Sequence, residues 1–146
     1  KIVPKYRMDL EKKNIQEGVK FLKENAKNAN VVEHRSGIQY KIIKDAEGSK
    51  PKPTDLVRIH YVGKLIDGTT FDSSYSRGET AVFPVNRVVP GFSQGLQLMS
   101  PGAKYQIFIP GQLGYGSGDG PGGPMAVMIF QIELLEILSS PENIKE

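Results

Sequence analysis

Hydrophobic residues recur with two different periods along this chain. Over residues 8–29 they follow one another at intervals of seven, four and three, which is the spacing of one face of an α-helix. These residues are Met8, Ile15, Val19, Leu22, Ala26 and Ala29. Gly18 weakens such a helix by about 1 kcal/mol without ending it. The apolar face has to be buried, either on its own domain or on a second chain, and the pattern leaves both open.

After Gly37 the period changes to two, which is typical of strands with one buried face. Strands are predicted at residues 38–42, 57–65, 81–85, 104–109 and 127–137. A helix of about two turns is predicted after Pro90-Gly91. Because the connections leave little room for crossover helices, the sheet should be mainly antiparallel, and the fold class is α+β.

Asp67-Gly68 predicts the turn of a hairpin, since both residues accept a positive φ. A two-residue turn at this point would place Phe71 opposite Lys64, on the polar face of the hairpin. A bulge or a longer turn would return Phe71 to the apolar face.

Composition narrows the class of protein. A chain of 146 residues suits one domain with a modest extension. Its 19 Lys and Arg are interspersed with 16 Asp and Glu, so no nucleic-acid partner is expected. No apolar run approaches the ~20 residues of a membrane span. No signal segment follows Lys1, and we therefore expect that a leader was removed or that the chain was trimmed.

Several kinds of site are disfavoured by the residues present. The chain has no cysteine and only two histidines, His34 and His60, so a zinc site is not expected. We expect no cofactor. The spaced glycines of residues 118–123 formally fit a dinucleotide pattern, but prolines surround them and a strand follows. They predict a flexible loop. Asp67 and Asp72 could form a carboxylate pair, yet the turn already explains Asp67.

Aromatic and aliphatic residues gather in the loop-rich middle of the chain, where turns are usually polar. They include Phe71, Phe83, Val88-Val89, Phe92 and Tyr115. Such residues could fill the core, or they could line an apolar cleft with a few polar groups, the usual form of a small-ligand site.

Specific strings now show a resemblance to the FKBP-type prolyl cis–trans isomerases. They are Val57-Arg-Ile-His-Tyr61-Val-Gly63, Gly68-Thr-Thr-Phe71-Asp72-Ser-Ser74, Val88-Val-Pro-Gly-Phe92-Ser-Gln-Gly-Leu96, Gly102-Ala-Lys104, Ile109-Pro110, Leu113-Gly-Tyr115-Gly116 and Phe130-Gln-Ile-Glu-Leu-Leu135. They occur in the family's order over residues 36–138. The resemblance implies a strongly twisted, mainly antiparallel sheet wrapped around a short helix. It also implies isomerase activity on X-Pro bonds of polypeptides.

The resemblance assigns roles to particular residues. Around the proline ring it places Tyr61, Phe71, Phe83, Val88, Val89, Phe92 and Phe130. The Val89 backbone N–H would donate to a substrate carbonyl, and Asp72 would face the twisted amide. The Tyr115 hydroxyl would donate a hydrogen bond to the peptide, and Arg77 would pair with Asp72 or Tyr61. Macrolides such as rapamycin would bind in the same pocket.

Residues 18–40 are similar to the linker helix of the macrophage infectivity potentiator subgroup, which implies a secreted or periplasmic protein and a possible homodimer through the N-terminal helix. The expected organisation is an extension over residues 1–35, an isomerase domain over 36–139 and a tail over 140–146. An alternative stays open, because Gly122 occupies a position where an apolar flap residue is common. The cleft would then belong to a proline-segment-binding chaperone or interaction module with little turnover.

Overall fold

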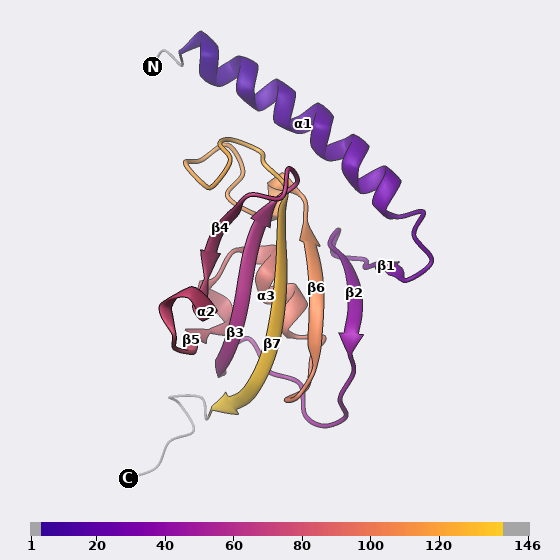
Figure 1. Cartoon of the computed structure of the whole chain (residues 1–146), viewed down its shortest axis with the longest axis vertical. Coiled ribbons are helices and arrows are strands. Elements are labelled where there is room, and N and C mark those ends of the chain that lie inside the picture. Colours follow the sequence, from indigo (N-terminus) through magenta and orange to yellow (C-terminus); the bar gives the residue numbers. More distant parts are fainter. Residues whose placement is uncertain (1–3, 139–146) are drawn as a thin grey trace.

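The computed structural model describes residues 4–138, and in it a long helix crosses one end of a twisted sheet (Figure 1). The helices are α1 (Lys5–Asn25), α2 (Ser74–Arg77) and α3 (Pro90–Leu96), with short 3-10 turns η1 (Val85–Arg87) and η2 (Gly111–Leu113). The strands are β1 (Val31–Glu33), β2 (Gln39–Lys44), β3 (Leu56–Leu65), β4 (Thr70–Ser73), β5 (Ala81–Pro84), β6 (Lys104–Ile109) and β7 (Met128–Leu138).

The sheet is antiparallel at every pairing of its strands, in the order β1-β2-β6-β7-β3-β4, with β5 pairing along the far end of β3. Alternate residues of β3 and β7 are buried, as the period of two predicts. The α+β class and the antiparallel sheet are therefore confirmed. The five predicted strands are present with ends shifted by two residues or fewer, whereas no hydrophobic alternation predicted the short strand β1.

One face of the sheet wraps around α3, whose Phe92 and Leu96 are buried (Figure 1). Two glycines allow this helix to lie close to β6. A Cβ at Gly91 would come within 2.5 Å of Ile109, and one at Gly95 within 2.9 Å of Ile107. Because packed cores leave no free volume for such an atom, the short helix can sit against the sheet only with glycine at these positions.

The hairpin between β3 and β4 differs from a simple two-residue turn. Leu65 accepts a hydrogen bond from Gly68 and donates one to Thr69, so three residues form the turn. Lys64 then lies opposite Thr70, and the next pair is Gly63 with Asp72. Phe71 is thus the extra residue of a β-bulge, and the register that would pair it with Lys64 is wrong.

Helix α1 begins three residues earlier than predicted and ends at Asn25. The first three residues of its predicted apolar face point away from the sheet, whereas Leu22 and Ala26 of the same face are half-buried. Met8, Ile15 and Val19 are 56%, 40% and 63% exposed, while Gly18 is buried against Val127. The contacting face mixes apolar Leu10 and Phe21 with polar Arg7 and Asn14 and with Gly18, so the spacing of hydrophobic residues alone does not identify it.

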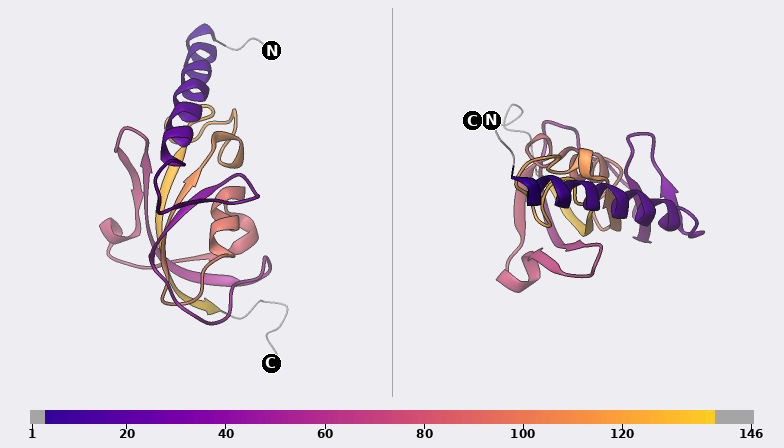
Figure 2. Two further views of the ribbon diagram at one scale, coloured as in Figure 1. Left: turned by 90° about the vertical axis from the view of Figure 1, so that its right-hand side faces the viewer. Right: turned by 90° about the horizontal axis from the view of Figure 1, so that it is seen from above.

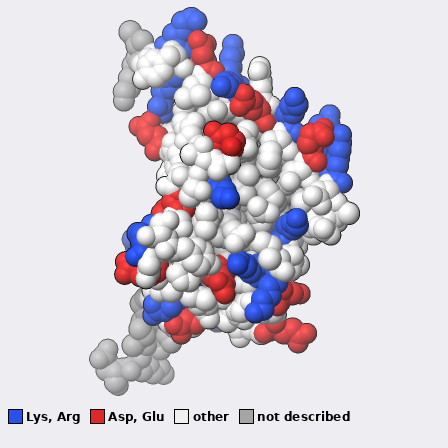
Figure 3. Space-filling model, in the orientation of Figure 1, with Lys and Arg blue, Asp and Glu red and all other residues white. Residues whose placement is uncertain are grey.

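Charges of both signs are interspersed on the face shown in Figure 3, which carries no basic stripe. Among the described helices, none is long and apolar enough to cross a membrane. Strand β1 lies in the range expected for the extension and pairs with β2, and the predicted domain boundaries stay predictions. The predicted tail, residues 140–146, lies outside the described residues.

Candidate functional site

A cavity of about 440 Å³ opens between β3, β4, β5, the start of α3 and the loop before β7. It is lined by Tyr61, Phe71, Asp72, Phe83, Arg87, Val88, Val89, Phe92, Tyr115 and Phe130. Nine of these ten residues were predicted from the sequence as site residues. The tenth predicted residue, Arg77, does not line the cavity but donates hydrogen bonds to Tyr61 and Asp72, which do.

The floor of the cavity is aromatic and nearly dry. Tyr61, Phe92 and Phe130 are 5%, 4% and 7% exposed. Phe92 and Phe130 meet edge to face with ring centroids 4.8 Å apart, and Tyr61 meets Phe92 in the same way at 6.1 Å. Phe83 closes one side at 5.9 Å from Tyr61. Edge-to-face rings fix one another's orientation, so the floor has a defined shape.

Gly63 makes room for the contact between the rings of Phe71 and Phe130. It lies opposite Phe130 in the sheet, and a Cβ here would come within 2.7 Å of Phe71 and 2.8 Å of Phe130. The bulge at Phe71 turns its ring into the space that Gly63 leaves, where it meets Phe130 at 5.5 Å and 89°. The bulge and the glycine together supply this wall.

Three polar groups form a connected set at one edge of the floor. The Tyr61 hydroxyl donates to one carboxylate oxygen of Asp72 at 2.5 Å. Arg77 donates to the other carboxylate oxygen at 2.5 Å and to the Tyr61 hydroxyl oxygen at 3.0 Å. Asp72 follows Phe71 at the bulge, and Arg77 ends the single turn of α2. Each group therefore holds the other two in place.

The charge states of this set follow from its contacts. Burial alone would raise the pKa of the Asp72 carboxyl, but the hydrogen bonds from Tyr61 and Arg77 outweigh burial and hold that pKa below its ordinary 3.8. Burial, followed by the bond to Asp72, raises the pKa of Tyr61 above 10.0. Near neutral pH the cavity thus presents a carboxylate and a neutral phenol, backed by the Arg77 cation.

Tyr115 stands on the opposite side of the cavity, in the loop of residues 114–127 that we call the rim loop. It is 52% exposed, unlike the floor aromatics. Gly120 covers its ring so closely that a Cβ there would lie 2.4 Å from the Tyr115 Cγ. The rim loop thus supplies the one half-exposed aromatic residue of the lining.

Sequence reasoning missed Arg87 and the particular use of Gly63. Arg87 ends the η1 turn immediately before Val88-Val89, and its side chain reaches the cavity from there. The residues that follow it, Val88 and Val89, predicted only the apolar part of the lining. No pattern of charge or period would have placed Arg87 at the cavity.

The described residues do not form the site of a serine hydrolase, in which a serine acts as the nucleophile. Gly91-Phe92-Ser93-Gln94-Gly95 matches the Gly-x-Ser-x-Gly string of serine hydrolases, but it lies inside α3, and the Ser93 hydroxyl accepts from Gln97 at 3.2 Å. Two serines in the described residues lie 2.8 Å from a histidine: Ser36 beside His34 in the turn before β2, and Ser74, the first residue of α2, beside His60 of β3. Ser74 is 0% exposed and bonds to the Tyr61 backbone, so no substrate reaches it.

No group of three or more His, Cys, Asp or Glu within residues 4–138 is placed to hold a metal ion.

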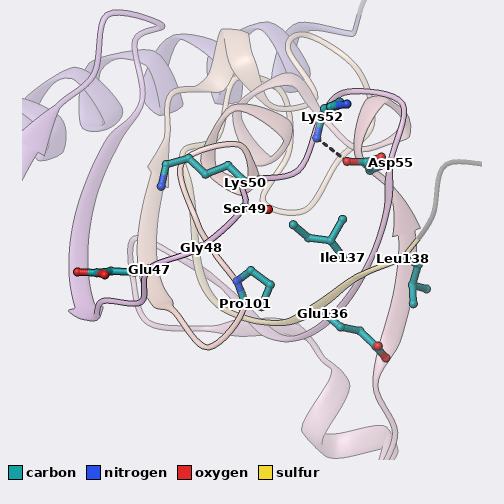
Figure 4. A pocket seen from close by; sticks show the side chains of 10 residues that line it. All are labelled: Glu47, Gly48, Ser49, Lys50, Lys52, Asp55, Pro101, Glu136, Ile137 and Leu138. Carbon is teal, nitrogen blue, oxygen red and sulfur yellow. Dashed lines mark hydrogen bonds between the residues drawn. The ribbon is translucent and has the colours of Figure 1, made fainter.

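A larger hollow of about 640 Å³ lies at the other end of the sheet, between the loop before β3 and the end of β7 (Figure 4). Two carboxylates on its rim are already engaged. The Lys52 backbone N–H bonds to Asp55 at 2.8 Å, and Glu136 pairs with Arg58 at 2.7 Å. It has no aromatic wall and no buried polar group facing inward, so the smaller cavity is the candidate functional site.

Comparison with known families identifies the family to which the chain belongs. The family model described as "FKBP-type peptidyl-prolyl cis-trans isomerase" matches residues 47–135, more than half of the chain. The chain belongs to this family. A second model, the "domain amino terminal to FKBP-type peptidyl-prolyl isomerase", matches residues 4–42. The resemblance drawn from the sequence motifs is confirmed.

Relatives of the FKBP family agree with this assignment along most of the chain. The chain is 52% identical to the FKBP-type 22 kDa peptidyl-prolyl cis-trans isomerase of Escherichia coli, over 84% of its own length and 60% of that protein's. It is 43% identical to the outer membrane protein MIP of Legionella longbeachae, over 85% and 54% of the two lengths. The crystal structure of FkpA from Escherichia coli superposes with a TM-score of 0.89 at 34% identity, covering 93% of this chain and 64% of that one.

Proposed function

We propose that this chain catalyses the cis–trans isomerisation of X-Pro peptide bonds in polypeptides. The observation that carries the proposal is the dry aromatic floor bordered by the set Tyr61, Asp72 and Arg77. Family membership supports the same activity. The chain spans about half of the length of several curated relatives, so the activity is proposed for the described domain itself.

The physical demand of this reaction suits an apolar cavity. Rotation about a peptide bond faces a barrier of about 18–20 kcal/mol, and an X-Pro bond takes tens to hundreds of seconds without help. No bond is made or broken, so no nucleophile is needed. In the twisted transition state the amide has lost its resonance, and its carbonyl is less polar than in the planar form. A dry floor disfavours the planar form, and every 1.36 kcal/mol gained is about tenfold in rate.

We assign roles within the cavity on this basis. The aromatic floor, with Phe92 and Phe130 at its centre, receives the proline ring. The Asp72 carboxylate faces the twisted amide, and Tyr61 and Arg77 fix its orientation. Two further groups hold the peptide: the Val89 backbone N–H donates to a carbonyl before the bond, and the Tyr115 hydroxyl donates from the rim loop.

The test is the cis-to-trans rate of a short X-Pro peptide with and without the protein, repeated with Asp72→Ala and with rapamycin. We expect acceleration that falls with the substitution and with the macrolide, since both act at one cavity. No acceleration over several residues before proline would overturn the proposal. If the same peptides still bound to the protein, the chain would instead be a proline-segment-binding module with little turnover.

The exposed apolar residues of α1 support a homodimer through this helix. Met8, Ile15 and Val19 lie on the side turned away from the sheet. We expect sedimentation equilibrium to show a dimer that Ile15→Asp with Val19→Asp separates into monomers. The matched control is Gln16→Asp with Lys20→Asp, two exposed neighbours on the same helix. A wild-type monomer would contradict the dimer.

We also propose that the protein works outside the cytosol. One relative is named an outer membrane protein. Fractionation of cells that express the protein from its own gene should recover it outside the cytosol. Recovery with cytosolic markers alone would overturn this proposal.

A further inference from the structure

One face of α1 lies directly on the rim loop. Arg7 donates to the Asp119 carboxylate at 2.6 Å and to the Ser117 carbonyl at 2.7 Å. Asn14 donates to two other carbonyls of the loop, those of Gly122 at 3.0 Å and Pro124 at 2.8 Å. The helix thus bonds to both ends of the loop's central stretch. Figure 2 shows α1 crossing that end of the molecule above the loop.

Apolar contacts complete the same face of the helix. A Cβ on Gly123 would come within 2.7 Å of the Leu10 side chain, and a Cβ on Gly18 within 2.9 Å of Val127. The contacting helix positions are 7, 10, 14 and 18, and these intervals of three and four keep them on one side. The polar members of this side explain why the face escaped the hydrophobic pattern.

The rim loop has little regular structure of its own and contains a strained residue. Met125 adopts φ of +59°, which costs a residue with a side chain about 1 kcal/mol or more and persists only when the surroundings impose it. Its N–H donates to the Gly116 carbonyl at 2.7 Å, which closes the loop on itself. Asn14 binds the Pro124 carbonyl, in the peptide unit that leads into Met125. The helix therefore supports the loop at its strained point.

Contacts lead from the helix to the cavity in a continuous series. Arg7 holds residues 117 and 119, and the adjoining Gly120 is the surface on which the Tyr115 ring rests. Tyr115 in turn lines the cavity. The Tyr115 ring is half exposed, so this packing and the loop backbone determine where its hydroxyl lies.

We propose that Arg7 and Asn14 of α1 are positioning residues for substrate recognition, because they clamp the rim loop and thereby hold Tyr115 at the cavity. The proposal rests on the proposed isomerase function. The N-terminal helix is then part of the peptide-binding apparatus as well as an extension of the domain. Its effect falls on binding of the peptide rather than on rotation at the aromatic floor, which α1 does not contact.

The test measures kcat and KM separately for Arg7→Ala with Asn14→Ala. We expect KM to rise about three- to tenfold while kcat stays within about twofold, since the clamp acts on binding. The matched control is Lys20→Ala with Gln16→Ala, which removes one cation and one amide from the exposed side of the same helix. This control should behave as wild type. An unchanged KM in the clamp variant, or an equal rise in the control, would overturn the proposal.

A double-mutant cycle separates positioning of Tyr115 from a general loosening. In a Tyr115→Ala background the clamp substitutions should raise KM no further, because the group they position is gone. A full, additive rise would contradict the proposed route. If the variant that combines Arg7→Ala and Asn14→Ala does not fold, Asp119→Ala removes the ion pair to Arg7 from the loop side. We expect this substitution to raise KM in the same direction but by a smaller factor.

Amide hydrogen exchange of residues 115–125 distinguishes failure of the clamp from failure of the proposed function. Without any isomerase activity in wild type, faster exchange of these amides in the clamp variant, and not in the control, would still support the clamp. Unchanged exchange would overturn it, whatever the activity.

Discussion

The two sides of the cavity are built in opposite ways. The floor comes from central strands and α3, and its three innermost aromatics are each less than a tenth exposed. The rim comes from a glycine-rich loop whose Tyr115 is half exposed and whose shape depends on bonds to a distant helix. Residues packed in a core keep their position at little further cost, whereas loop residues need outside support. We therefore expect the floor to govern the rate of rotation and the rim to govern affinity.

Removal of a floor ring should have the largest effect. Phe130→Ala should lower kcat/KM more than about thirtyfold, because it opens the dry surface to water, and it should cost about 3–5 kcal/mol in the free energy of unfolding. The matched control is Ile132→Ala on the same strand, which is also buried but does not line the cavity. Peptide kinetics and denaturant unfolding should show similar destabilisation in both variants. If only Phe130→Ala loses activity, the loss comes from the aromatic floor and not from reduced stability of the fold.

Asp72 should come next. Asp72→Asn keeps the shape but removes the charge that orders Tyr61 and Arg77, and we expect kcat/KM to fall about tenfold. The effect should appear mainly in kcat. A rise in KM with kcat unchanged would show that Asp72 contributes to peptide binding, as the rim does, and not to the rate of rotation.

The pH profile gives a second measure of the same carboxylate. Because the folded-state pKa of Asp72 is lowered, its contribution to stability is present above the ordinary pKa of 3.8 and is lost as pH falls through the lower folded value. Activity should therefore show an acid limb only below about pH 4, and Asp72→Asn should lack that limb. A limb beginning near pH 6 in wild type would contradict this assignment.

The smallest effect should follow from a change at the rim. Gly120→Ala places a methyl group where the Tyr115 ring now lies, so the ring must move. We expect KM to rise about threefold with kcat unchanged. Ser117→Ala, an exposed change in the same loop that leaves the carbonyl bonded to Arg7, is the control and should have no effect.

The sequence predicted the floor far better than the rim. Alternation along residues 57–65 and 127–137 identified the buried faces of β3 and β7, and the family motifs supplied Phe71, Asp72 and Phe92. The bulge at Phe71 could not be assigned, since Asp67-Gly68 suits a turn of two residues or of three. The clamp face of α1 was missed for a different reason. Its contacts are hydrogen bonds from Arg7 and Asn14 to loop carbonyls, and backbone acceptors leave no trace in the sequence.

Exchange NMR of an X-Pro peptide tests the central claim most directly, because it measures the interconversion of the cis and trans forms at equilibrium. With the wild-type protein at low concentration, we predict exchange cross-peaks between the two forms on a timescale far shorter than the tens of seconds of the free peptide. With Phe130→Ala folded at the same temperature, these cross-peaks should be lost. Equal exchange with both proteins would show that the aromatic floor does not carry the reaction.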